Sequence, residues 1–274
     1  MNKNTISILG CGWLGLPLAK KLVNQGYLVK GSSTSETKLT ILQEWNIKPY
    51  LIKFKPDIDG SADFFDAATL IVSIPPSLRN NSGEYFIQQV LNLANCISFS
   101  SISNVIYTSS TSIYPELNRE MHEDDITSVE SSASPFLYRA EEIFSSLENQ
   151  NVTILRLGGL TGYDRLLVKY FAGKKGLTNG NEKINLLHRD DAIDVLINFI
   201  SSPEKSGIYN VVSPAHPTKS EFYTFLAKKY GLEQPEFIEN ASPWKTISAS
   251  KLIKELNFKF KFPDPFQFSY LNQL

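Results

Sequence analysis

The 274-residue chain has very little cysteine and histidine. Its two cysteines, Cys11 and Cys96, are too few for a disulfide framework, so we interpret them as small apolar side chains in a reducing compartment. The three histidines, His122, His188 and His216, are far apart and show no metal-ligand spacing. We therefore predict no metal site.

The chain also lacks an excess of either charge and any long hydrophobic run. Lys and Arg number 27 and Asp and Glu number 28, which gives a net charge of −1. This balance offers no electrostatic reason for binding nucleic acid or a membrane surface. No apolar run approaches membrane-spanning length, and only Met1 to Asn4 precede the first strand-like run. We expect a cytoplasmic monomer or homodimer that acts on a small molecule.

A glycine-rich turn, "ILGCGWLG" (residues 8–15), joins the first strand-like run to a helical pattern. Apolar residues continue to Leu9, and from Leu14 they recur at helical spacing until Gly26, which has the position of a helix-ending glycine. The turn contains Gly10, Gly12 and Gly15. G-x-G-x-x-G between a strand and a helix is typical of a dinucleotide-binding turn, although a glycine-rich turn of another α/β protein is the alternative.

Each element of this turn has a predicted role. Gly10 allows the tight turn, Gly12 lets the backbone approach a pyrophosphate, and Gly15 lets the helix pack closely on the strand. We expect the backbone N–H groups of Trp13 and Leu14 to donate to the pyrophosphate, because a helix N-terminus attracts anions.

The end of the second strand indicates which dinucleotide is bound. An NAD site usually carries an acidic residue there, about twenty residues past the first glycine, to bind the ribose hydroxyls. This chain has Ser32, Ser33 and Thr34 instead, followed by Lys38, and these groups can donate to a 2′-phosphate. We predict NADP rather than NAD, with ordinary helix-capping residues as the alternative. Predicted cofactor residues after the fourth strand are Ser73, Ile74 and Pro75.

Strand and helix patterns alternate along most of the chain. Further strands are expected over 27–31, 50–54, 70–74, 105–108, 152–155 and 207–212, and helices over 36–45, 84–99, 136–147, 190–200 and 219–229, with Asp190 as an N-cap. This βαβ alternation predicts the α/β class, with a Rossmann-type doubly wound parallel sheet. We divide the chain into a dinucleotide-binding domain, 1–160, and a smaller carboxy-terminal α/β substrate-binding region, 161–274, which adds a late strand to the sheet.

Three further stretches carry a family resemblance: "IYTSSTSIYP" (106–115), "ILRLGGLTGYDR" (154–165) and "INLLHRDDAIDVLINFI" (184–200). With the glycine turn, they resemble the extended and atypical short-chain dehydrogenase/reductases, the NAD-dependent epimerase/dehydratase superfamily. The resemblance covers essentially the whole chain. It implies a nicotinamide dinucleotide and hydride-transfer chemistry on a sugar nucleotide or another small carbonyl or hydroxyl substrate.

The same resemblance implies catalytic residues, with one departure. Ser110 falls where the family binds the substrate oxygen, and Tyr138 where it has an acid/base tyrosine. The family's lysine four residues later, which lowers the tyrosine pKa, is replaced by Glu142. A tyrosine with an ordinary pKa of about 10 is ionised in only about one part in a thousand at pH 7. Two hypotheses stay open: a slow enzyme, or a non-catalytic NADP-binding sensor.

A competing resemblance is to the hydroxyacid-dehydrogenase and imine-reductase families. They share G-x-G-x-x-G and a turn like "SIPPS" (73–77) after the fourth strand. Those families would require a long all-helical carboxy-terminal domain. The "RLGGLTG" stretch (156–162) and the strand expected over 207–212 argue against one.

Overall fold

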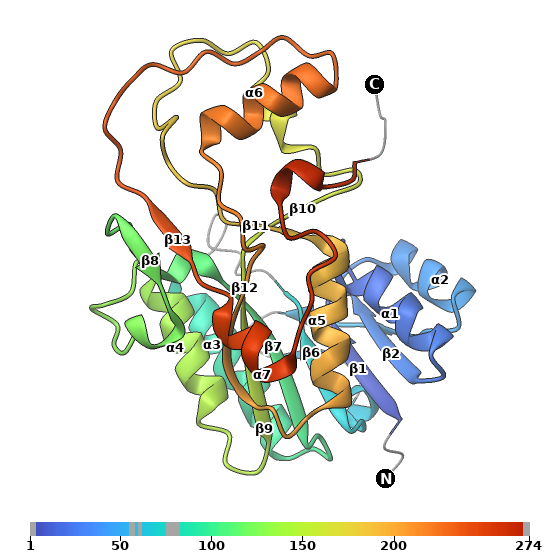
Figure 1. Ribbon diagram of the computed structural model, residues 1–274. Helices are drawn as coiled ribbons and strands as arrows, with labels where there is room; N and C mark the ends of the chain where they lie inside the picture. Colours follow the sequence, from blue (N-terminus) through green and yellow to red (C-terminus); the bar gives the residue numbers. More distant parts are fainter. Residues whose placement is uncertain (1–3, 55–57, 60–61, 75–82, 271–274) are drawn as a thin grey trace. The chain divides into compact units, whose positions relative to one another are not determined.

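The central sheet has seven strands in the order β12-β9-β7-β6-β1-β2-β3 (Figure 1). We describe it from a computed structural model, which describes residues 4–54, 58–59, 62–74 and 83–270. The strands are β1 (Thr5–Leu9), β2 (Leu28–Ser33), β3 (Lys48–Leu51), β6 (Thr69–Val72), β7 (Asn104–Ser110), β9 (Asn151–Leu157) and β12 (Gly207–Val211). Pairing is parallel between β1 and β2, β2 and β3, β1 and β6, and β6 and β7. The chain order therefore reverses between β1 and β6, the kind of position where doubly wound sheets bind ligands.

The seven helices follow the strands much as the sequence predicts. They are α1 (Gly15–Asn24), α2 (Glu36–Glu44), α3 (Gly83–Ser98), α4 (Pro135–Ser145), α5 (Arg189–Ser201), α6 (Lys219–Lys229) and α7 (Ser250–Leu256) within the described ranges. Gly26 follows α1 with a φ of 89°, as expected for a glycine after a helix end. The predicted Rossmann-type fold class is confirmed.

The chain divides into two compact units. Unit 1 comprises Met1–Ser109, Ser134–Leu155 and Ile193–Ile208, and unit 2 comprises Ser110–Ala133, Arg156–Ala192 and Tyr209–Leu274. The chain thus passes between the units several times. The sequence-based division near residue 160 stays a prediction.

Unit 1 has helices on both faces of its strands. Leu9 belongs to a buried cluster with Phe86 of α3 and Phe144 of α4. Successive strand residues point to opposite faces, so the neighbouring Ile8 points away from that cluster. Ile8 lies instead under Gly15 of α1, where a Cβ would come 3.4 Å from the Ile8 side chain.

Unit 2 has a separate, aromatic core. Phe222, Tyr223 and Leu226 of α6 pack with Phe268 and Tyr270 near the carboxy-terminal end of the described chain. Two short parallel pairs that were not predicted from sequence also lie in this unit. They are β10 (Gly159–Thr161) with β11 (Leu186–His188), and β8 (Arg119–Met121) with β13 (Lys245–Ile247).

The predicted third strand, 50–54, is wrong in its position. Asn46 has a φ of 56°, a left-handed conformation that asparagine tolerates, and the amide of Ile47 bonds back to the Leu42 carbonyl at 3.0 Å. This sharp end to α2 lets β3 start at Lys48. The following β4 (Lys53–Phe54) pairs antiparallel with β5 (Ile58–Asp59) outside the main sheet.

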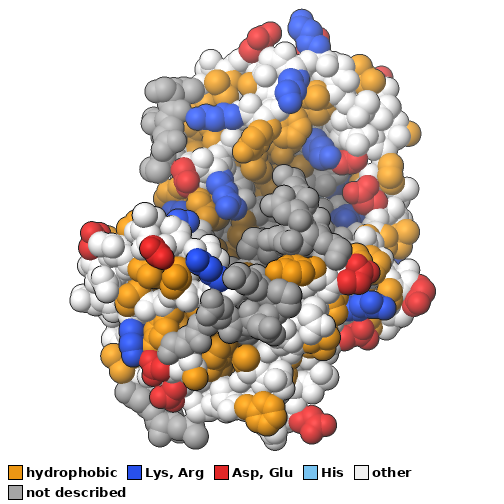
Figure 2. All heavy atoms as spheres, turned by 180° about the vertical axis from the view of Figure 1, so that it is seen from behind, with side chains coloured by type: hydrophobic (Ala, Val, Ile, Leu, Met, Phe, Trp, Pro, Cys, Tyr) orange, Lys and Arg blue, Asp and Glu red, His pale blue; other side chains and the backbone are white. Residues whose placement is uncertain are grey.

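Charges of both signs are interspersed on the face seen in Figure 2, with hydrophobic side chains between them. Within the described ranges, no helix is long and apolar enough to cross a membrane. In the same part of the chain, no three His, Cys, Asp or Glu side chains come together as metal ligands. The absence of a nucleic-acid partner stays a prediction.

Candidate functional site

A cavity of about 320 Å³ lies in unit 1 at the carboxyl ends of β1, β2 and β6. Its volume is at the lower end of the usual range for small-molecule sites, about 300–1,000 Å³. The predicted cofactor residues that line it are Gly10, Gly12, Ser32, Ser33, Thr34, Lys38, Ser73 and Ile74. The structure thus brings the glycine turn, the end of β2 and the end of β6 together around one space.

The three glycines of the turn face different surroundings. Gly10 has a φ of 103°, and a Cβ there would lie 2.5 Å from the Ser73 carbonyl oxygen. A Cβ on Gly15 would lie 2.2 Å from the Gly10 carbonyl oxygen, so α1 packs on the turn more closely than any side chain allows. A Cβ on Gly12 would meet no atom within 4 Å. Gly12 therefore presents bare backbone to open space, as a phosphate cradle requires.

Ser32 fastens the turn to the end of β2. Its Oγ accepts from the Gly10 N–H at 2.9 Å, and its carbonyl accepts from the Cys11 N–H at 2.8 Å. Cys11 is packed so closely on β2 that a Cβ on Gly31 would lie 2.8 Å from its Sγ. Burial raises the pKa of the Cys11 thiol to about 12, so this side chain acts as a protonated filler.

The end of β2 offers donors and no acid. Ser33 Oγ accepts from the Ser35 N–H at 3.1 Å, which leaves its own proton to donate. Thr34 and Lys38 are exposed at the rim of the cavity. No Asp or Glu lines this cavity within the part of the chain that the structure describes, and Glu36 is not among its lining residues.

Three predicted cofactor residues that the structure describes, Trp13, Leu14 and Gly15, do not line the cavity. Leu14 is the buried N-cap residue of α1 and makes no side-chain capping bond, and Trp13 precedes it at the same turn. Pro75 lies outside the described residues. The sequence reasoning did not assign Leu9, Cys11, Ile52, Phe86 and Gln89, which also line the cavity. Phe86 and Gln89 are buried three positions apart in α3, so the helical period could have placed both toward the sheet.

The two predicted catalytic residues belong to different units. Ser110 ends β7 in unit 2, and its Oγ accepts from the Ser112 N–H at 3.1 Å, so that it caps a short 3₁₀ helix, η2 (Thr111–Ile113). Tyr138 is half-buried on α4 in unit 1. Glu142, in the family's lysine position, is exposed.

A buried carboxylate anchors the helix that carries Tyr138. Glu141 is 2% exposed and accepts from the Ser109 Oγ at 2.5 Å. Nearby, Tyr107 is also fully buried, and its hydroxyl has no hydrogen-bond partner among the described residues. These contacts join α4 to the end of β7, close to the strand's transition into the Ser110 turn.

A buried polar network holds the Ser110 turn in unit 2. Arg156 is fully buried and donates through Nη1 to the Tyr114 hydroxyl at 2.8 Å and to the Glu123 carbonyl at 2.9 Å. The Tyr114 hydroxyl donates in turn to Asn210 Oδ1 at 2.7 Å, and the Asn210 N–H donates to the Glu123 carboxylate at 2.8 Å. Each of these buried polar groups has a partner, as stable packing demands.

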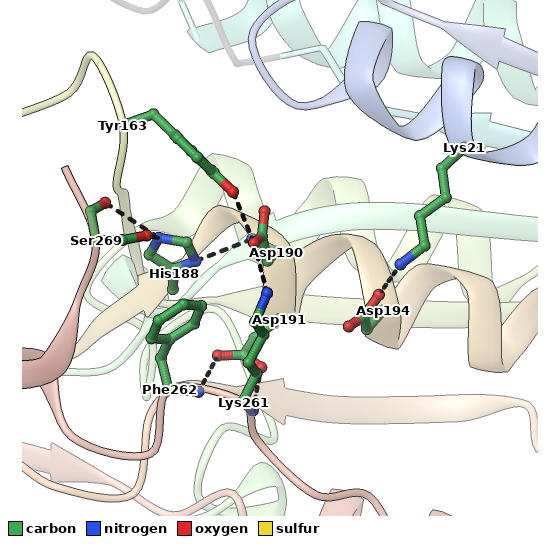
Figure 3. Close-up of polar contacts among 9 residues, drawn as sticks. All are labelled: Lys21, Tyr163, His188, Asp190, Asp191, Asp194, Lys261, Phe262 and Ser269. Carbon is green, nitrogen blue, oxygen red and sulfur yellow. Dashed lines mark hydrogen bonds and ion pairs between the residues drawn. The ribbon is translucent and has the colours of Figure 1, made fainter. Parts of the chain in front are cut away.

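His188 caps α5, and the predicted N-cap role of Asp190 is wrong. Figure 3 shows the His188 ring between Asp190 and Ser269. The Asp190 N–H donates to His188 Nδ1 at 3.2 Å, so the ring proton is on Nε2, which faces the Ser269 carbonyl at 3.4 Å. The helix starts one residue earlier than expected, at Arg189, because the preceding imidazole supplies the acceptor. Asp190 instead accepts from the Tyr163 hydroxyl at 2.7 Å.

The next acidic residue, Asp191, fastens the carboxy-terminal segment to α5. It is fully buried, and its carboxylate accepts from the backbone N–H groups of Lys261 and Phe262 at 2.7 and 3.0 Å. Farther along the helix, Asp194 forms an ion pair with Lys21 of α1 within unit 1 (Figure 3). Both roles are structural.

Stability should fall as the pH drops below about 6.5, the ordinary pKa of an unfolded histidine. Burial lowers the pKa of His188, an effect that the Arg189 and Lys261 charges reinforce and the Asp190 charge opposes. Below about pH 6.5 the unfolded chain therefore binds a proton at this histidine more readily than the folded chain does. The contribution of neutral His188 to the free energy of unfolding is complete above that pH and is lost as the pH falls below it. Burial shifts the pKa of His216 in the same direction.

The check is to measure the melting temperature from about pH 7.5 to about pH 5. His188→Asn keeps an acceptor for the Asp190 N–H and should melt with a shallower pH dependence than the parent chain. The matched control is His122→Gln, at a histidine whose side chain is 50% exposed, which gives the background effect of removing one imidazole from the surface. Equal slopes in His188→Asn and the parent would contradict the assignment.

Comparison with known proteins supports the fold and adds a relative. No family model matches the chain. Protein YeeZ of Escherichia coli (strain K12) is 32% identical over 266 residues, which cover 95% of this chain and 97% of YeeZ. This extent of identity places the two proteins in one family.

Similar solved structures include UDP-glucuronic acid 4-epimerase from Bacillus cereus in complex with NAD, with a TM-score of 0.77, 17% identity and coverage of 97% of both chains. UDP-N-acetylglucosamine 4-epimerase from the same organism has a TM-score of 0.74, 18% identity and coverage of 94% of both chains. A functionally unknown conserved protein from Silicibacter pomeroyi DSS has a TM-score of 0.74, 18% identity, and coverage of 96% of this chain and 95% of that one. The chain therefore belongs to the family of YeeZ and shares its fold with the two UDP-sugar 4-epimerases from Bacillus cereus.

Proposed function

We propose that the protein binds NADP in the unit 1 cavity and reduces or oxidises a small carbonyl or hydroxyl substrate, of which a sugar nucleotide is one candidate. The observation that carries the proposal is the cradle at Gly12, where bare backbone faces open space between the ends of β1 and β2. A phosphate group needs such an approach to the backbone, at the N-terminal end of a helix that follows a strand. The two epimerases of the same fold, whose substrates are UDP-sugars by name, support the substrate class.

The preference for NADP follows from the chemistry at the end of β2. A 2′-phosphate there would meet the hydroxyls of Ser33 and Thr34 and the ammonium of Lys38, and none of the described lining residues is a carboxylate that would repel it. Hydrogen bonds to a charged group contribute about 1.5–3 kcal/mol each. Two of them would favour NADP over NAD by about a hundredfold or more.

Calorimetric titration with both nucleotides tests this preference. Lys38→Met should weaken NADP binding by about tenfold or more and leave NAD binding unchanged, because only the 2′-phosphate meets the ammonium. Lys20→Met, on α1 outside the cavity, is the control and should alter neither affinity. NAD binding as tight as NADP binding would refute the proposed preference.

The chemical step needs a group that orients the substrate oxygen and a group that moves a proton. When bound, the dinucleotide supplies or accepts the hydride. We assign the substrate oxygen to Ser110, whose Oγ already accepts from the Ser112 N–H and so has its own proton available to donate. We assign proton transfer to Tyr138. General acid–base help of this kind typically contributes about 10²–10⁴-fold, and with Glu142 in the position of the family's lysine we expect part of it to be lost.

The test is NADPH oxidation with a panel of carbonyl compounds, together with UDP-sugar interconversion. We expect slow, substrate-dependent turnover that falls by about a hundredfold in Ser110→Ala and in Tyr138→Phe. The control is Tyr170→Phe, which should keep full activity because Tyr170 is an exposed tyrosine of unit 2 with no proposed role in the site. Full activity in Tyr138→Phe would show that a group other than Tyr138 transfers the proton.

A second function is favoured by one specific observation, the exposed Glu142 in the position of the family's lysine. In this alternative the protein is a non-catalytic NADP sensor that retains the cofactor cavity. Tight NADP binding combined with no turnover of any panel compound by the parent chain would establish the sensor and exclude the enzyme.

A further inference from the structure

Lys245 is a half-buried lysine whose backbone is fixed on two sides within unit 2. The Asn185 side chain spans this segment, donating to the Lys245 carbonyl at 3.0 Å and accepting from the Ile247 N–H at 2.9 Å. Just before it, Trp244 exchanges two hydrogen bonds with Asn118, at 2.8 and 2.9 Å. The pairing of β13 with β8 adds further support. The base of this side chain is therefore held in place before any ligand binds.

The ammonium of Lys245 is only partly satisfied by protein groups. Nζ donates to the Tyr114 carbonyl oxygen, 131 residues away in the sequence. Within the described ranges it makes no ion pair and no other hydrogen bond, so two of its three N–H donors have no protein acceptor. Burial lowers the pKa of Lys245, while the more distant carboxylates of Glu116 and Glu182 raise it. Glu182 is itself paired with Lys219.

This partly satisfied cation lies at the end of the turn that begins with the proposed substrate-binding serine. Ser110 caps η2, and Tyr114, the residue that Lys245 contacts, follows η2 directly. A 3₁₀ helix rises about 2 Å per residue, so the turn separates Ser110 from Tyr114 by about 6–8 Å. Because Arg156 and Asn210 hold the Tyr114 hydroxyl, the turn and the lysine form one rigid arrangement.

We propose that Lys245 binds an oxyanion of the substrate, a phosphate or a carboxylate, within about 10 Å of the oxygen assigned to Ser110. This inference rests on the proposed function, because only that function makes the bound oxyanion part of a substrate. It narrows the substrate class to carbonyl or hydroxyl compounds that also carry an anionic group. A half-buried ammonium is only partly hydrated, and an incoming oxyanion would supply the acceptors and the counter-charge that the described protein groups do not.

The experiment measures the reactivity of individual lysines in the native protein by trace acetylation and peptide mass spectrometry. Pyrophosphate and malonate are titrated separately as probes of phosphate and carboxylate binding. We expect the acetylation rate of Lys245 to fall, by about tenfold when the probe reaches ten times its dissociation constant, because only the free site reacts. Lys254, exposed on α7, is the internal control and should react at a constant rate.

Each outcome has a defined meaning. Protection by pyrophosphate alone assigns a phosphate, by malonate alone a carboxylate, and by both a general oxyanion site. Protection by neither overturns the proposal, as does equal protection of Lys254. Protection of Lys245 by NADP alone would also overturn it, since the bound oxyanion would then belong to the cofactor.

A second measurement separates this proposal from the cofactor proposal. In Gly12→Val, which should no longer bind NADP, the probes should still protect Lys245. Phosphorus NMR line broadening of pyrophosphate should be lost in Lys245→Met and retained in Lys245→Arg, which keeps the charge. Unchanged broadening in Lys245→Met would refute the role of this lysine, whatever the result of the NADP titrations.

Discussion

Gly12→Val should raise the dissociation constant for NADP by at least about a hundredfold, or about 2.8 kcal/mol, while the protein stays folded. A Cβ at this position would meet no atom within 4 Å apart from its chain neighbours, so we expect the unliganded chain to accommodate a valine side chain. The same side chain would occupy the space through which the pyrophosphate must approach the backbone. Calorimetry measures the affinity, and the melting temperature shows that the fold is intact.

Gly15→Val is the matched variant with the opposite expected result. Its Cβ would lie 2.2 Å from the Gly10 carbonyl oxygen, so the substitution should destabilise the fold itself. Unchanged NADP affinity in a folded Gly12→Val protein would show that the glycine turn does not form part of the cofactor site. Normal stability in Gly15→Val would show that α1 packs less tightly than the structure describes.

Arg156→Met should lower the free energy of unfolding by about 3–6 kcal/mol, because two hydrogen bonds from a charged group are lost at about 1.5–3 kcal/mol each. The guanidinium is fully buried, and its removal leaves the Glu123 carbonyl and one acceptor position on Tyr114 without this donor. Urea unfolding of the parent and the variant measures the difference.

Arg119→Met provides the control for this experiment. Arg119 likewise makes two hydrogen bonds, here to the Asp125 carboxylate at 2.9 and 3.0 Å, but its side chain is 47% exposed. Surface pairs of this kind contribute about 0–1 kcal/mol. If the two variants lose equal amounts of the free energy of unfolding, the buried network around Tyr114 stabilises the fold no more than a surface ion pair does.

Local sequence patterns were sufficient to predict the fold class and to identify most of the residues that line the unit 1 cavity. The glycine turn and the serines that end β2 are contiguous signals, and the order of parallel strands brings them to one edge. The predictions for the position of β3 and for the residue that caps α5 were wrong, and each error has a local cause. Asn46 adopts a left-handed conformation, and His188 supplies an acceptor that the usual capping residues would otherwise provide.

The rest depends on contacts between residues that are distant in sequence. β8 and β13 have three residues each, too few for a hydrophobic period to be visible. Their pairing brings Lys245 to Tyr114, and nothing in "SPWKTIS" (242–248) distinguishes this lysine from a solvated one. The partners of Arg156 are similarly distant, so a buried arginine could be identified only once the strands were in place.

The double hydrogen bonding of Ser32 has a consequence for how cofactor choice can evolve. Because the Ser32 hydroxyl accepts from the Gly10 N–H, a mutation that removes this hydroxyl would disturb the glycine turn as well as the end of β2. The backbone bond from the Cys11 N–H to the Ser32 carbonyl would remain. Thr34 and Lys38 are exposed, and no hydrogen bond joins either of them to the described residues of the glycine turn. Under the proposed function, the preference between NADP and NAD can therefore be changed at Thr34 and Lys38 without removing a bond to the turn, whereas a change at Ser32 also affects the turn.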